Sequence, residues 1–156
     1  MRRTAPETII FRTETPAEVL AAMAELAPGT GWIILQPGFD PEDATAVGAA
    51  LGASIRGATA VKCSWVPAER SRRRPDYVAL GLEHGAGPKV ARRLSELGVA
   101  IPEPWAVIQD HPRRGLVVAV PLAERHRDVL DWLLRAGDVL TSLPLTGEWR
   151  ALVFRR

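Results

Sequence analysis

The strongest constraint on the fold of this 156-residue chain is the order of secondary-structure signals in its second half. Short apolar runs typical of strands alternate there with longer segments that have apolar residues at helical spacing. Six elements are expected from these patterns: a strand at 77–83, a helix at 88–98, strands at 105–109 and 116–120, a helix at 124–139 and a strand at 149–154. Residues 76–156 therefore have the order strand–helix–strand–strand–helix–strand.

This order is that of a split β-α-β sandwich, the ferredoxin-like topology. In such a sheet the first and third strands are central, and the second and fourth strands are edges. Residues 116–120 are wholly apolar, as a central strand should be, and the last strand ends in Arg155 and Arg156, which suits an exposed edge. We therefore predict an α+β fold whose mixed sheet has the ferredoxin-like βαββαβ order in residues 76–156.

The first 66 residues predict a β-α-β-α-β unit that extends this sheet. Its expected elements are a strand at 8–12, a helix at 16–27, a strand at 32–36, a helix at 41–52 and a strand at 59–66. Thr15 and Glu18 have the spacing of a capping box, with Pro16 at the first helical position. Residues 32–35 are continuously apolar, as expected when both faces of a strand are covered. The strand–helix–strand order recurs at 116–154, which suggests a degenerate duplication, although this order also recurs by chance.

Residues 67–75 predict a polar, Arg/Pro-rich loop between the two units. The arginines at positions 70, 72, 73 and 74 form the only evident basic cluster in a chain whose net charge is +2. A field that holds nucleic acid usually requires a larger basic face. A chain of this length forms one domain or two very small ones that share a core, and we expect one compact domain.

The single cysteine and the N-terminal residues indicate the compartment. Cys63 has no second cysteine with which to form a disulfide, and we expect it to be buried and inert. The arginines near the N-terminus are not followed by an apolar run before Pro6 and Glu7, so we expect no signal peptide. The apolar runs are too short to span a bilayer. We therefore expect a cytoplasmic protein without a membrane partner.

The predicted topology brings two polar segments to one corner of the sheet. The strands at 77–83 and 105–109 are expected to be parallel, so their carboxyl ends meet at the same edge. A glycine-rich turn follows the first strand, and a charged turn follows the second. The residues expected at this corner are His84, Gly85, Gly87, Lys89, Asp110, His111, Arg113 and Arg114.

These residue types predict a site for a small anionic ligand. The N–H groups at the start of the helix after Gly87 are unpaired, and a helix start of this kind favours anions. Lys89 lies in the first turn, where a cation is unfavourable to the helix dipole and a bound anion would relieve it. Arg113 and Arg114 offer bidentate donors nearby. The alternative is a glycine-rich connection whose charged neighbours are merely solvated.

No motif in the sequence fixes a reaction, and the fold does not select a function. We predict a small non-enzymatic binding module for an anionic ligand or a protein partner, such as a second copy of the chain, without a metal or cofactor. One alternative is an enzyme that acts on an anionic or phosphorylated small molecule with His111 or His84 as acid/base. Another is a protein or RNA interaction module that uses residues 70–74 or a sheet face. We do not expect nucleic acid, because residues 116–120 include no aromatic side chain.

Overall fold

The structure of the protein is a computed structural model that describes residues 4–39, 54–55, 58–59, 61–70, 72–73 and 75–156. Its elements in chain order are β1 (Glu7–Arg12), α1 (Ala17–Glu25), β2 (Gly31–Phe39), β3 (Ser54–Ile55), β4 (Ala58–Thr59), β5 (Lys62–Glu69), β6 (Tyr77–Glu83), α3 (Val90–Glu96), β7 (Ala106–His111), β8 (Gly115–Pro121), α4 (His126–Leu140) and β9 (Leu145–Arg155). The predicted α+β class is confirmed. Among these helices, none has both the length and the apolar character needed to cross a membrane.

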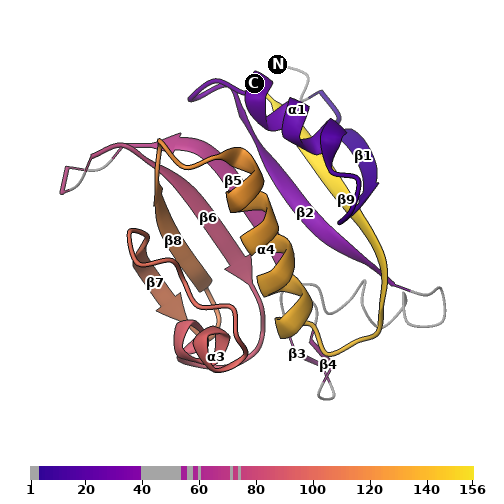
Figure 1. The fold of residues 1–156 in the computed structure, drawn as a ribbon, viewed down its shortest axis with the longest axis vertical. Coiled ribbons are helices and arrows are strands. Elements are labelled where there is room, and N and C mark those ends of the chain that lie inside the picture. Colours follow the sequence, from indigo (N-terminus) through magenta and orange to yellow (C-terminus); the bar gives the residue numbers. More distant parts are fainter. Residues whose placement is uncertain (1–3, 40–53, 56–57, 60, 71, 74) are drawn as a thin grey trace.

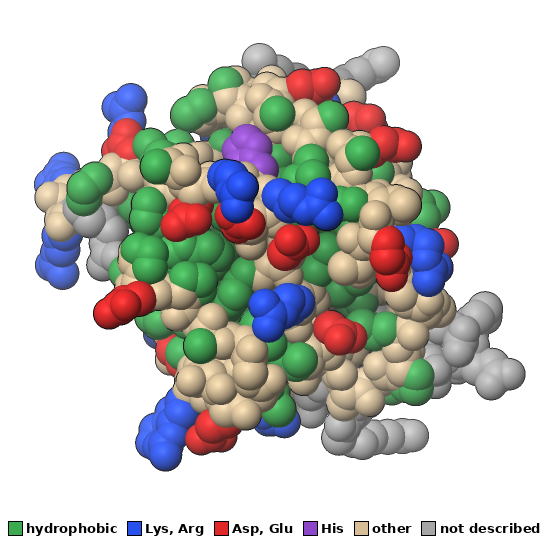
Figure 2. Space-filling view, in the orientation of Figure 1, with side chains coloured by type: hydrophobic (Ala, Val, Ile, Leu, Met, Phe, Trp, Pro, Cys, Tyr) green, Lys and Arg blue, Asp and Glu red, His purple; other side chains and the backbone are tan. Residues whose placement is uncertain are grey.

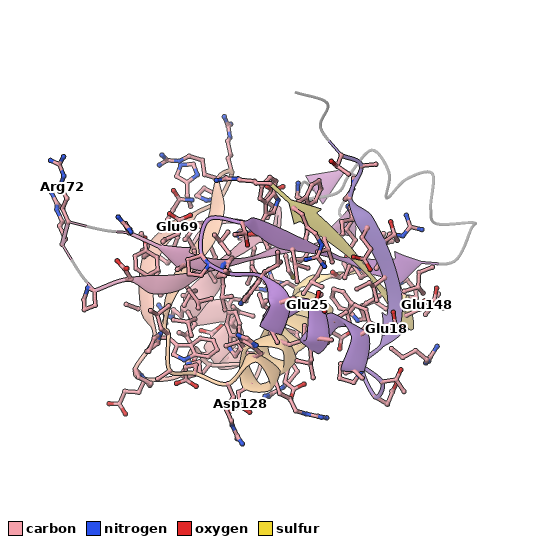
Figure 3. The ribbon with its side chains drawn as sticks, turned by 90° about the horizontal axis from the view of Figure 1, so that it is seen from above. Glu18, Glu25, Glu69, Arg72, Asp128 and Glu148 are labelled. Atoms are coloured by element: carbon pink, nitrogen blue, oxygen red, sulfur yellow. The ribbon has the colours of Figure 1, made fainter. Side chains whose placement is uncertain are left out.

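Seven of the strands form one sheet in the order β1-β9-β2-β5-β6-β8-β7 (Figure 1). The described helices all lie on one side of this sheet, and Glu18, Glu25 and Asp128 mark that side in Figure 3. We call the opposite side of the sheet the open face, because no helix of the described residues covers it. β3 and β4 pair separately as a short ribbon.

The sheet is antiparallel throughout these seven strands, so the predicted mixed sheet is wrong. β6 and β7 are parallel to each other, as predicted, but β8 lies between them and runs the opposite way. β1 and β2 are likewise parallel, with β9 between them. α1 and α3 each join strands that are two positions apart, and an opposing strand fills each gap. α4 joins β8 and β9, which are four positions apart, so no neighbouring strands are parallel.

The fourth strand departs from the ferredoxin-like order. β6, β8 and β7 are neighbours as predicted, but β9 does not pair with β6, and β5 takes that place. β9 is therefore an internal strand and not the exposed edge that Arg155 and Arg156 suggested. Its sequence explains the position, because apolar side chains lie on both of its faces: Trp149, Ala151 and Val153 are buried, and Leu152 and Phe154 alternate with them. The duplication stays a prediction.

Two element boundaries also differ from the predictions. α1 begins directly after Pro16, which is its N-cap, and no side-chain hydrogen bond caps it, so the capping box at Thr15 is wrong. β5 extends to Glu69, and the start of the loop predicted at 67–75 therefore belongs to a strand. The helix predicted at 41–52 lies outside the described residues.

α4 lies over the middle strands of the sheet, and its predicted apolar face is buried (Figure 1). Val129, Trp132, Leu133 and Ala136 are each at most 5% exposed. Cys63 of β5 lies beneath this face, with its Sγ atom 3.8 Å from the carbonyl oxygen of Leu133. Burial raises the pKa of the Cys63 thiol to about 12, so the side chain is a neutral part of the core, as the sequence predicted.

Candidate functional site

The structure brings the two predicted segments together at one corner of the sheet. Asp110, near the end of β7, accepts hydrogen bonds from the backbone N–H groups of Val90 (3.2 Å) and Ala91 (3.0 Å). These are the first two residues of α3. A carboxylate from the sheet therefore caps the helix, and it satisfies two of the N–H groups that a helix start otherwise leaves unpaired.

The turn before α3 has an unusual backbone. Gly85, Gly87 and Lys89 have φ angles of 58°, 87° and 59°, which lie in the left-handed region. Glycine adopts this region without steric cost, whereas a residue with a Cβ atom seldom does. At the base of the turn, Nδ1 of His84 accepts the N–H group of Ala86 at 2.9 Å. The glycines and the imidazole together fix the direction in which the chain enters α3.

His84 is a structural part of this corner. Its residue surface is only 1% exposed, and its Nε2 atom has no hydrogen-bond partner in the described part of the chain. Burial is the main reason that the pKa of His84 lies below its ordinary value of 6.5; the charge of Asp110 opposes the shift, and that of Arg93 adds to it. The imidazole is therefore neutral near pH 7 and remote from solvent.

The charged turn after β7 is held by its own histidine. Nδ1 of His111 accepts the backbone N–H groups of Arg113 and Arg114, both at 3.0 Å. The two arginines are exposed. The predicted meeting of residues 84–89 and 110–114 is thus present, and the role in anion binding stays a prediction. The corner has fewer free hydrogen-bond donors than the sequence suggested, because the backbone N–H groups of Val90 and Ala91 already donate to the carboxylate of Asp110.

A second candidate site lies on the open face. A sheet face was one of the predicted alternatives, but the residues of this site were not predicted. A depression of about 910 Å³ runs along β5 on this face. Cys63 and Trp65 of β5 point to the helices, where they contact Leu133 and His126. Because side chains alternate along a strand, their neighbour Ser64 points into the depression.

The depression has a floor of small residues and a wall of bulky ones. Ser64 pairs with Gly81 across β5 and β6, and a Cβ atom at position 81 would crowd the hydroxyl of Ser64. The wall is formed by Trp32, whose ring stacks on Phe154 with centroids 5.0 Å apart and planes 7° from parallel. The guanidinium of Arg156 lies 5.3 Å from the ring centroid of Trp32. These contacts fix the orientation of the Trp32 indole beside the depression.

Basic and acidic residues are balanced around the depression. The charged residues that line it are Lys62, Arg70, Arg156, Glu69, Asp76 and Glu83. Lys62 and Glu83 form an ion pair of 3.2 Å across β5 and β6. No cluster of three or more His, Cys, Asp or Glu side chains suited to a metal ion occurs among the described residues. The depression therefore combines apolar surface with a rim of mixed charge.

No known protein-family model matches the chain, and no curated protein or solved structure is significantly similar to it. The sequence did contain one signal of the open face. Residues 32–35 are apolar on both sides of β2, which predicts a strand that is covered on both faces. In the described structure, helices cover only the side of Ile33 and Leu35.

Proposed function

We propose that the protein is a non-enzymatic binding module that docks a protein partner on the open face of its sheet. The observation that supports this function is a group of bulky apolar side chains on that face: Trp32, Ile34, Leu152 and Phe154. Each is only half-buried, whereas the neighbouring side chains that point to the helices are almost fully buried. Contiguous apolar surface that is partly exposed to solvent is a feature of interaction sites in soluble proteins.

The alternation along β2 supports a partner on the side that the described helices leave uncovered. Ile33 and Leu35 are each 1% exposed beneath the helices, and Trp32 and Ile34 point the opposite way. A partner on the open face would bury Trp32 and Ile34, as the helices bury Ile33 and Leu35. On the helix-covered side, acidic and basic side chains are interspersed among apolar ones (Figure 2).

The balance of charge favours a protein over a polyanion. Nucleic-acid sites and sites for small anions have a surplus of basic groups, because the ligand's charge has to be neutralised. Among the described residues, the depression instead has as many acidic as basic side chains along its rim. A protein surface of mixed charge fits such a rim better than a phosphate-rich ligand does. Arg72 of the β5–β6 loop does not add to this rim, because it projects away from the sheet (Figure 3).

The alternatives at the corner have less support. The imidazole of His84 is too deeply buried for a substrate to reach, and its Nδ1 atom already accepts a backbone N–H group. The start of α3 is occupied by the carboxylate of Asp110. An enzyme with His84 as its acid/base would have to open the corner before each turnover.

Photocrosslinking in cells tests the proposed function with two matched positions. Leu122 lines the depression and is 54% exposed, whereas Leu97 follows α3 on the helix side and is 46% exposed. We expect p-benzoylphenylalanine in place of Leu122 to give one discrete protein adduct, which the further change Ile34→Arg removes. The same group in place of Leu97 gives no such adduct. No adduct at position 122, or the same adduct from both positions, would overturn the proposal.

A thermal-shift experiment tests the anionic-ligand alternative. Inorganic phosphate and ATP are added to the wild type and to Arg114→Ala and His111→Ala. We expect no stabilisation of any of the three proteins beyond that of chloride at the same ionic strength. Stabilisation of the wild type that both variants lose would assign anion binding to the corner and show that this alternative is right for that surface.

A further inference from the structure

The open face has a bulky half and a hollow half that are matched residue by residue. On the bulky side, Trp32 pairs with Phe154 and Ile34 pairs with Leu152 across β2 and β9. On the hollow side, Val66 pairs with Ala79 and Ser64 pairs with Gly81 across β5 and β6. Ile34 in turn pairs with Ser64, so both halves lie in the same two rows. The boundary between them is the line between β2 and β5.

From this match we infer that the partner docked on the open face is a second copy of the chain. A two-fold axis that runs along the strands, between β2 and β5, turns one open face onto the other. It places β2 over the partner's β5 and β9 over the partner's β6. In one row the bulky side chains then enter the space above small ones: Ile34 lies over the partner's Ser64, and Leu152 lies over the partner's Gly81. The inference rests on the proposed function, because it uses the same surface.

Charge follows the same symmetry. Arg150 pairs with Gln36 on β9 and β2, and Lys62 pairs with Glu83 on β5 and β6, so these four side chains form the next row of the open face. The two-fold axis brings Arg150 of one copy opposite Glu83 of the other, and Gln36 opposite Lys62. Arg150 is exposed and has no ion-pair partner in the described part of the chain. In the dimer, Glu83 of each copy would pair with Arg150 of the other, which gives two equivalent ion pairs.

The surface is large enough for a stable dimer. With the axis between β2 and β5, the strands from β1 to β8 overlap the partner's strands, and only β7 extends beyond the contact. Strands about 4.8 Å apart and about 3.3 Å per residue give a face of roughly 25 by 27 Å, or about 700 Å² per copy. Specific interfaces bury about 600 to 1,000 Å² on each partner. Two twisted sheets stack in this way about 10 Å apart, with their inner side chains interdigitated.

Sedimentation velocity of the purified protein gives the first test. We expect a species of twice the 17.0 kDa chain mass. Gly81→Val fills the space that the partner's Leu152 would occupy, and it should weaken the dimer at least about tenfold. The monomer should remain folded, because valine favours a strand more than glycine does. Among the described residues, only the Ser64 hydroxyl crowds the added Cβ atom, and that hydroxyl can rotate away.

Charge reversal gives a second test that does not depend on packing. Arg150→Glu and Glu83→Arg should each weaken the dimer by about tenfold, and the two changes together should restore it. The exchange of Arg92 and Glu96, an ion pair on α3, serves as the matched control and should leave the dimer unchanged. Circular dichroism and thermal unfolding confirm that each variant is folded.

The outcomes separate this inference from the function on which it rests. A wild type that sediments as a monomer up to about 100 µM, or a double charge reversal without recovery, overturns the dimer. If the crosslink at position 122 then joins a different protein, the docking function stands with another partner. If the crosslink is also absent, both fail. An adduct of two identical chains, together with recovery in the double variant, supports both.

Discussion

The cap that joins the sheet to α3 gives a prediction whose size can be worked out from its contacts. Asp110→Ala removes the acceptor of two backbone hydrogen bonds, one partly buried and one exposed. Loss of a helix N-cap costs about 0.5 to 2 kcal/mol, and charged hydrogen bonds fall toward the upper part of that range. Because Asp110 is exposed, we expect a loss of about 1.5 kcal/mol, or a fall in Tm of about 3 to 6 °C.

Urea unfolding and amide hydrogen exchange measure this effect at two levels. The free energy of unfolding should fall in Asp110→Ala, and it should fall less in Asp110→Asn, which keeps one oxygen acceptor. The amides of Val90 and Ala91 should exchange faster in Asp110→Ala than in the wild type, while the amides of β8 change little. A loss below about 0.5 kcal/mol with unchanged exchange at Val90 and Ala91 would refute the capping role.

Three further predictions concern buried groups. Because burial lowers the pKa of His84 in the folded state, protonation favours unfolding; stability should therefore decline as the pH falls below 6.5. His84→Asn should flatten this decline in urea unfolding followed at several pH values, and an unchanged slope would contradict it. Cys63, with a pKa of about 12, should resist a thiol reagent until the chain unfolds; rapid labelling of the native protein would show that the core opens locally. Gly137→Ala should destabilise by roughly 1 kcal/mol although alanine favours helices, because the new methyl group lies 2.8 Å from the ring of Trp149 and crowds it; an increase in stability would mean that the ring can move.

The sequence predicted local elements and the corner well, because both depend on residues that are near one another along the chain. The split β-α-β order required only that the strands before and after α3 be parallel, and the glycines after β6 mark a sharp turn. The conclusion that residues 84–89 meet residues 110–114 followed from that order alone. What the sequence did not show is that Asp110 itself would occupy the start of α3.

The neighbours of β9 were not predictable from the same signals. A terminal pair such as Arg155 and Arg156 suits an edge, but it is equally compatible with an internal strand whose end reaches solvent. The pairing of β9 is set by the gap that α1 leaves between β1 and β2, and this gap is a property of the whole sheet. The residues of the open face were missed for a similar reason, because the apolar run at 32–35 indicated two covered sides without showing which side the described helices leave uncovered.

The position of β9 also has a consequence for biosynthesis. Glu7 pairs with Val153, so β1 must wait for β9, which is synthesised after every other described strand, before its backbone is satisfied. Until β9 is present, the backbone groups of β1 and β2 that face each other have no strand to pair with. Pairing of strands so far apart in the sequence is slow. Fragments that end before residue 145 should therefore be substrates for chaperones and proteases, and neither half of the gene should yield a stable product alone.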